Sequence, residues 1–127
     1  MKVDENKEYG CLDLHYENDV LHFRKLLGEH YIDFHRTHCT TIEAMRFLVS
    51  LFEYVVKPDE IDKVFKVNDE YVQVRITMLH NMTYLGLRVA SEPTDLHKTE
   101  WCIFQSYLGN PIKYGLRDYI ITLLSFT

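Results

Sequence analysis

The sequence lacks the short motifs that identify most enzyme classes from the amino acids alone. It contains no glycine-rich phosphate loop, no Cys-x-x-Cys pair, no Gly-x-Ser-x-Gly and no His-Glu-x-x-His. Each of these patterns places a nucleophile, a metal ligand or a phosphate-binding backbone in a defined local geometry. Their absence favours a function without catalysis, and we expect no bound cofactor.

Cysteine, proline and glycine are scarce as well. The three cysteines, Cys11, Cys39 and Cys102, are an odd number, which excludes a complete set of disulfides and favours a reducing compartment. Three prolines and five glycines do not provide the composition of a linker or a disordered tail. Since 46% of the residues are apolar, which suffices for one core, we expect residues 1–127 to form a single domain.

The chain also has no cluster of Lys and Arg and no long apolar run. Its formal net charge is −5, and residues 1–70 carry 15 acidic against 9 basic side chains. Because nucleic acids and anionic membranes are bound largely through clustered basic residues, we expect neither as a partner. The most apolar segment, 119–126, is far shorter than the about 20 residues that span a bilayer. Residues 1–8 are polar and acidic, unlike a secretory signal, so we expect a cytoplasmic protein.

The clearest structural pattern is a helix over residues 41–57. Thr40 and Glu43 form a capping-box pattern, in which each side chain accepts a hydrogen bond from a backbone N–H of the first turn, and Pro58 ends the segment. Apolar residues at helical spacing follow the cap: Met45, Leu48, Val49, Phe52, Val55 and Val56.

A second helix is expected before it, over residues 19–35. Asn18 and Asp19 resemble a helix start, and the apolar residues that follow lie three or four apart: Val20, Phe23, Leu27, Tyr31 and Phe34. Gly28 leaves open a division into two shorter helices. Ahead of this segment, residues 9–16 alternate apolar and polar from Leu12 on, which indicates a short edge strand.

Over residues 62–90 the apolar residues recur at every second position. Val72, Val74, Ile76 and Met78 alternate with polar neighbours, and the turns 68–70 and 80–83 separate three runs of this kind. This pattern predicts a three-stranded antiparallel meander. After it, an apolar stripe over 96–107 predicts a helix that ends at 109–111, and a further helix is expected from about residue 114. The predicted fold class is therefore α+β, with N-terminal helices, the meander, and C-terminal helical segments packed on one face of the sheet.

One cluster of histidines suggests a metal-binding site. His35, His38 and Cys39 bring three donors that zinc prefers close together in the sequence. On the helix expected there, His35 and His38 share a face, but a closed site requires a further ligand from elsewhere in the fold. A metal-dependent enzyme or metal sensor is thus the alternative to a non-catalytic function, and exposed or hydrogen-bonded histidines are the simpler interpretation.

The residues expected to contact a partner surround the meander. Acidic residues lie in or beside its turns, and tyrosines, which are enriched at interfaces facing Arg or Lys, occur nearby. The predicted contact set is Tyr54, Asp59, Glu60, Asp62, Asp69, Glu70, Tyr71 and Tyr84. We therefore hypothesise a small acidic protein-binding module, such as an inhibitor or a toxin-immunity protein, that covers a basic protein partner. A homodimer built on the apolar C-terminal segment or on a strand edge is a further alternative.

Overall fold

The structure is a computed structural model of the 127-residue chain, and it describes residues 1–56, 61–80 and 82–106, with the backbone alone over 52–56. Within these residues the elements follow the order β1 (Cys11–Glu17), β2 (Val20–Leu27), β3 (His30–His38), α1 (Thr41–Val56), β4 (Ile61–Val67), β5 (Glu70–Leu79), β6 (Met82–Ala90), the 3-10 helix η1 (Pro93–Lys98) and β7 (Cys102–Ser106). None of the helices among them is long and apolar enough to cross a membrane.

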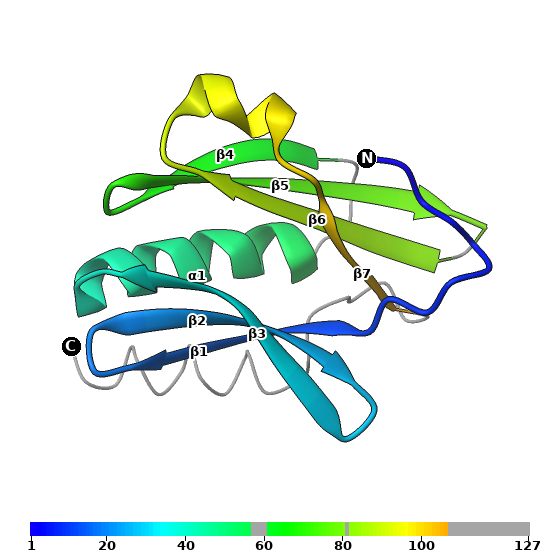
Figure 1. Ribbon diagram of the computed structural model, residues 1–127, viewed down its shortest axis with the longest axis horizontal. Coiled ribbons are helices and arrows are strands. Elements are labelled where there is room, and N and C mark those ends of the chain that lie inside the picture. The colour runs from blue at the N-terminus through cyan, green and yellow to red at the C-terminus, as the bar shows by residue number, and fades with distance from the viewer. Residues whose placement is uncertain (57–60, 81, 107–127) are drawn as a thin grey trace.

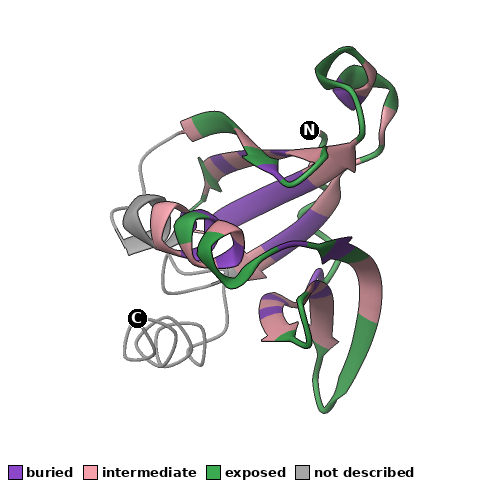
Figure 2. Ribbon diagram, turned by 90° about the vertical axis from the view of Figure 1, so that its left-hand side faces the viewer, coloured by how far each residue is buried: buried purple, intermediate pink, exposed green. Residues whose placement is uncertain are grey.

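The strands form two antiparallel sheets with α1 between them. Sheet A has the order β1-β2-β3, and sheet B has the order β4-β5-β6-β7. In Figure 1, α1 lies between the strands of sheet B above it and those of sheet A below it. Figure 2, turned by 90°, shows buried residues on α1 and on the strands that face it. One helix therefore supplies the inner layer for both sheets.

The two sheets meet where β1 approaches β7. The Gln105 backbone N–H donates to the Gly10 carbonyl at 3.0 Å, and the Tyr9 N–H donates to Gln105 Oε1 at 2.6 Å. A third hydrogen bond between the sheets comes from Lys25 of β2, whose Nζ donates to the Ile103 carbonyl at 2.8 Å. Burial lowers the pKa of this Lys25 amine. These bonds join the two sheets near β1 and β7.

Short turns explain why the N-terminal half forms strands. The register pairs Glu17 with Val20, which leaves the two-residue turn Asn18–Asp19, and both turn residues have positive φ, 52° and 63°. Asn and Asp tolerate this left-handed conformation, which two-residue hairpin turns require. Gly28, with φ 65°, serves the next hairpin in the same way. The chain therefore reverses at positions where a helix would continue.

The predicted helix over 19–35 is wrong, because this segment is the β2–β3 hairpin. Leu21 and Phe23 are both fully buried, whereas His22 between them is on the other face, so the burial alternates with a period of two. The helical stripe included Leu27 and Tyr31, which are exposed in the structure. The apolar residues of this segment therefore have helical spacing by chance, and its turns favour a hairpin.

The predicted helix over 96–107 is also wrong. Residues Pro93–Lys98 form a short 3-10 helix, and Cys102–Ser106 form β7, which pairs with β6. The α+β fold class with N-terminal and C-terminal helices is therefore contradicted by a mainly β architecture with one α-helix among the described residues. The helix expected from residue 114 lies outside the described residues.

Three other predictions are confirmed. The helix expected over 41–57 is α1, the meander expected over 62–90 is β4, β5 and β6, and the edge strand expected over 9–16 is β1. Among the side chains of α1 that the structure describes, 41–51, the buried ones are Ala44, Phe47, Leu48 and Leu51, so the buried side includes the predicted Leu48 and also residues outside the predicted stripe. A helix covered by two sheets buries a wider arc than one that packs on a single surface.

The core is continuous through α1. Phe47, 3% exposed, contacts Phe23 of sheet A with ring centroids 6.0 Å apart and Phe65 of sheet B with centroids 5.4 Å apart. The same cluster contains the inward-facing residues of both sheets: Leu12, Leu14, Leu21, Val67, Val72, Val74, Ile76, Leu85, Leu87 and Phe104. Phe47 thus connects the packing of one sheet to that of the other.

Truncation of Phe47 should consequently destabilise the whole domain. We expect Phe47→Ala to lower the free energy of unfolding by about 3–5 kcal/mol, through lost apolar burial and the cavity that remains. Ile42→Ala is the matched control on the same helix, because Ile42 is 55% exposed, and its effect should stay within about 0.5 kcal/mol. Urea unfolding followed by circular dichroism measures both, and equal midpoints for the two variants would contradict the shared core.

Candidate functional site

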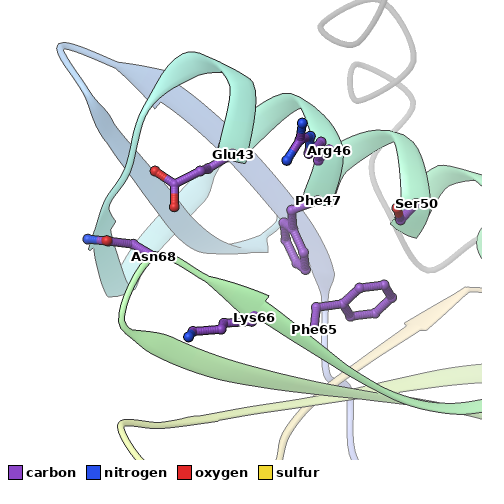
Figure 3. Close-up of a pocket in the computed structure, with 7 residues that line it drawn as sticks. All are labelled: Glu43, Arg46, Phe47, Ser50, Phe65, Lys66 and Asn68. Carbon is purple, nitrogen blue, oxygen red and sulfur yellow. The ribbon is translucent and has the colours of Figure 1, made fainter.

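A groove runs between α1 and the edge strand β4. Figure 3 shows its lining, with four residues from α1 and three from β4 and the turn that follows: Glu43, Arg46, Phe47, Ser50, Phe65, Lys66 and Asn68. The hollow has a volume of about 440 Å³. Phe47 and Phe65 pack edge to face with an interplanar angle of 81°, and they form an apolar floor between charged side chains.

Strand β4 gives the groove a backbone edge. In the part of the chain that the structure describes, no strand pairs with β4 on the side away from β5. Val67 and Glu70 flank the two-residue turn, so their backbone groups hydrogen-bond to each other. In an antiparallel pair, every second residue then directs its N–H and C=O away from the partner strand, here away from β5. These residues are Asp62, Val64 and Lys66. Their N–H and C=O groups are positioned to pair with an added strand.

The capping box fixes one end of the groove. The Thr40 N–H donates to Glu43 Oε1 at 3.0 Å, and the Glu43 N–H donates to Thr40 Oγ1 at 3.2 Å, as the sequence predicted. The pKa of the Glu43 carboxyl lies below its ordinary value, chiefly because the Thr40 backbone N–H donates to it. Glu43 therefore presents a fixed negative charge beside Asn68.

A second hollow of about 370 Å³ adjoins the groove at this end. It is lined by Asp19, His38, Cys39, Thr40, Glu43 and Asn68, so Glu43 and Asn68 belong to both hollows. Two hydrogen bonds hold its walls together: Asn68 Nδ2 donates to the His38 carbonyl at 2.7 Å, and the Cys39 N–H donates to the Asp19 carbonyl at 3.0 Å. The groove thus continues past the start of α1.

Acidic residues from three distant segments gather around this hollow. The β1–β2 turn, the start of α1 and the β4–β5 turn lie at the same end of the molecule in Figure 1. These segments carry Glu17, Asp19, Glu43, Asp69 and Glu70, which we call the acidic end, and Asp19 and Glu43 line the hollow itself. Asp69 and Glu70 belong to the predicted contact set, whereas Glu17 and Asp19 do not. Asn18–Asp19 repeats the Asn-Asp pair of the turn at 68–69, which was predicted from the sequence. This similarity could have identified residues 18–19 as a second turn that carries an acidic side chain.

Glu70 holds the acidic end together. Its Oε1 accepts a hydrogen bond from the Thr37 hydroxyl at 2.8 Å, and its Oε2 lies 3.0 Å from His35 Nε2. Thr37 is only 2% exposed, so this contact links β3 of sheet A to the start of β5 in sheet B within the protein. Glu70 is therefore a structural residue, whatever further contact its carboxylate makes.

Other members of the predicted contact set are spread over the outer face of sheet B, the face turned away from α1. Asp62 accepts hydrogen bonds from Arg75 Nη2 at 2.7 Å and from Gln73 Nε2 at 2.8 Å. Tyr71 packs beside Lys66, whose Nζ lies 5.8 Å from the ring centroid. The structure therefore does not place Asp62 with Asp69 and Glu70 in one acidic patch.

Tyr84 is buried on that same outer face. It is 2% exposed, and its ring centroid lies 6.2 Å from that of Tyr9 in an edge-to-face contact. Met1 and Val3 pack against the same cluster, so the N-terminal segment covers this part of sheet B. Of the remaining predicted contact residues, Asp59, Glu60 and the side chain of Tyr54 lie outside the described residues.

The predicted metal ligands do not converge. On strand β3, His35 and His38 are three residues apart and point to opposite faces, whereas the expected helix placed them on one face. His35 faces Glu70, His38 is exposed, and Cys39 is buried. Among the described residues, no group of three His, Cys, Asp or Glu side chains is placed to hold a metal ion.

Cys39 is instead a buried neutral thiol. Burial, with the nearby Glu43 charge, raises the pKa of Cys39 from 9.0 to about 11. Thiolates, not thiols, act as nucleophiles and metal ligands, so this environment opposes both roles at neutral pH.

Comparison with protein-family models, with curated proteins and with solved structures found no match. The functional argument therefore depends on the geometry of the groove and of the acidic end, on the exposed strand edge, and on the charge of the chain.

The structural role of Glu70 can be measured directly. We expect Glu70→Gln to lower the free energy of unfolding by about 1–3 kcal/mol, because the amide keeps one acceptor oxygen for the Thr37 hydroxyl but loses the charge and the second acceptor oxygen that face His35. Asp69→Asn is the matched control at the neighbouring exposed turn position and should change stability by less than about 0.5 kcal/mol. Urea midpoints compare the two, and an unchanged midpoint for Glu70→Gln would show that the bridge contributes nothing.

Cys39 should also make the fold sensitive to alkali. Since its pKa is 9.0 unfolded and about 11 folded, the stabilisation is complete below pH 9 and is lost as the pH rises through 11. We expect Cys39→Ala to show a smaller fall in urea midpoint between pH 8 and pH 10.5 than the parent chain. Identical slopes for Cys39→Ala and the parent chain would contradict the raised pKa.

Proposed function

We propose that this protein is a protein-binding module that receives an extended segment of a basic partner in the groove between α1 and β4. The observation that carries the proposal is the coincidence of three features: an aromatic floor, an adjacent strand edge, and an acidic end into which the groove continues. Grooves between an edge strand and a helix suit extended peptides, because the strand supplies main-chain hydrogen bonds and the groove supplies side-chain pockets.

In this proposal the two ends of such a segment have separate roles. An apolar side chain of the partner would contact the Phe47–Phe65 floor, which lies below Arg46 and Lys66 at the rim. Further along, a Lys or Arg of the partner would reach Asp19 and Glu43. The net charge of −5 would speed the approach of a basic protein over distances longer than these contacts.

An inhibitor or a toxin-immunity protein is the narrower form of this proposal. Such a protein neutralises its target by covering a functional surface, and it requires complementary charge rather than catalytic groups. The absence of catalytic motifs in the sequence supports this form, as does the excess of acidic residues in positions 1–70.

A photo-crosslinking amino acid at position 66 tests the site in the cells that produce the protein. We expect a crosslinked partner of basic isoelectric point from position 66 and none from position 98, where Lys98 is exposed on η1 away from the groove. A crosslink to a second copy of this chain would indicate a homodimer. That result, an acidic partner, or equal yields at both positions would contradict the proposal.

Substitution at Val64 then tests the strand edge with the purified partner. Because the Val64 N–H faces outward, Val64→Pro removes a donor for the added strand without removing a bond to β5, and we expect affinity to fall by about tenfold. Val64→Thr retains the N–H and is the control. Association should also slow on the order of tenfold from low to high salt if the acidic end steers the partner. Unchanged affinity for Val64→Pro would exclude strand addition.

A further inference from the structure

The two walls of the groove are matched in spacing along its length. Glu43, in the first turn of α1, lines the groove together with Asn68, just after β4. Four residues further along α1, Phe47 packs on Phe65, and Figure 3 shows this pair between Glu43 and Ser50. Four residues of helix advance about 6 Å, and two residues of a strand advance about 6.8 Å. A strand added along β4 would therefore present every second side chain to a new position on α1.

Alternation along β4 decides which side chains of an added strand would face the groove. Directly opposed residues of neighbouring strands lie on the same face of a sheet. Val67 is 1% exposed and Phe65 packs on α1, so both belong to the inner side of β4. Val64 and Lys66 alternate with them and belong to the outer face, where Lys66 lies beside Tyr71. In an added strand, the residues opposed to Phe65 and Val67 would therefore face α1, and the residue between them would face outward.

The two inner positions have different surroundings. The residue opposed to Phe65 would lie on the Phe47–Phe65 floor, where apolar contact is available. The residue opposed to Val67 would lie beside Glu43 at the start of α1. The pKa of the Glu43 carboxyl is lowered, so it is charged at neutral pH, and Asp19 lines the adjoining hollow. A basic side chain suits this second position, because it is attracted by both carboxylates.

Positive charges at the rim restrict where that basic side chain can be. Lys66 is exposed on the outer face, so the added residue directly opposed to it meets a positive charge. Like charges directly opposed on neighbouring strands destabilise the pair. Arg46 adds a second positive charge on the α1 side of the floor. A basic residue is therefore disfavoured on the floor and opposite Lys66, and it is favoured beside Glu43.

The direction of the added strand sets the order of these positions in its sequence. All strand pairs in the described part of both sheets are antiparallel. Antiparallel pairing is slightly more stable per residue than parallel pairing, and it is the commoner of the two. In an antiparallel strand, the residue opposed to Val67 comes two positions before the residue opposed to Phe65.

We infer, on the basis of the proposed function, that the groove recognises an antiparallel strand in which a Lys or Arg stands two residues before a large apolar residue. The basic side chain lies beside Glu43, and the apolar side chain lies on the Phe47–Phe65 floor. The residue between them points outward opposite Lys66, and the residue after the apolar one packs beside Val64, which is 51% exposed. Glu43 and Lys66 thus determine which basic segments fit the groove.

Peptides of identical composition test this pattern on the intact chain. The first is acetyl-Thr-Arg-Thr-Leu-Thr-Ser-Thr-amide, which places Arg opposite Val67 and Leu opposite Phe65. The second exchanges Arg with the Thr that follows it, which moves Arg opposite Lys66. Nuclear magnetic resonance titration, followed at the backbone N–H of position 66, measures both, since this N–H faces the added strand. We expect the first peptide to bind at least fivefold more tightly than the exchanged peptide and than its own reversed sequence.

Substitutions of the two charged residues should weaken this preference in different ways. Glu43→Gln keeps an oxygen for the capping box but removes the charge, so the first peptide should bind at least twofold more weakly. Lys66→Gln removes the repulsion, so the exchanged peptide should bind at least twofold more tightly. Glu92→Gln is the matched control, because Glu92 is exposed and its side chain forms no cap hydrogen bond at η1. It should keep the parent preference.

The outcomes separate this inference from the proposed function. Equal affinities of the first and the exchanged peptide, or a preference undiminished in Glu43→Gln and Lys66→Gln, would overturn the inferred pattern. Tighter binding of the reversed peptide would overturn the direction. If the peptides bind equally and Val64→Pro weakens all of them, the pattern fails but strand addition at β4 stands. If no peptide shifts the signal of position 66, the inference is overturned, and the crosslink from that position decides the proposed function independently.

Discussion

The packing of α1 against two sheets at once is the constraint on which the structure depends. Phe47 contacts Phe23 on one side and Phe65 on the other, so this helix contributes to the inner layer of both sheets. Three- and four-stranded antiparallel sheets need a covering layer to bury their apolar faces, and here one 16-residue helix covers both. The position of β4 beside α1, and therefore the groove between them, follows from this shared core.

Polar contacts then fix how the two sheets meet around the helix. Lys25 and Gln105 tie the sheets together near β1 and β7, and Glu70 ties β3 to β5 near the start of α1. Each of these bonds joins residues far apart in the sequence, and each involves a buried or half-buried group that would be costly to leave unpaired. The acidic end is a consequence of the second tie, because it holds the β4–β5 turn against the strand that leads into α1. Charge at that end is therefore positioned by the fold.

The surface proposed for binding is a place where this pattern of satisfied groups is interrupted. Strand β4 directs the backbone groups of Asp62, Val64 and Lys66 away from its sheet. On the outer face of sheet B, by contrast, the Asp62 side chain is paired with Arg75. A partner could supply the missing hydrogen bonds at such places, which is why we propose binding there.

Local features could be predicted from the amino-acid order alone: the Thr40–Glu43 cap and α1, the alternating strands of the meander, the edge strand β1 and the acidic balance of the chain. It did not distinguish the β2–β3 hairpin from a helix, because Val20, Phe23, Leu27 and Tyr31 have helical spacing, and two-residue turns at 18–19 and 28–29 overrode that pattern. Packing between distant segments sets which acidic residues lie at one end of the molecule and which tyrosines are buried. The physical reason is that caps and turns depend on neighbours within a few residues, whereas the acidic end and the groove depend on contacts between strands and a helix that the sequence places far apart.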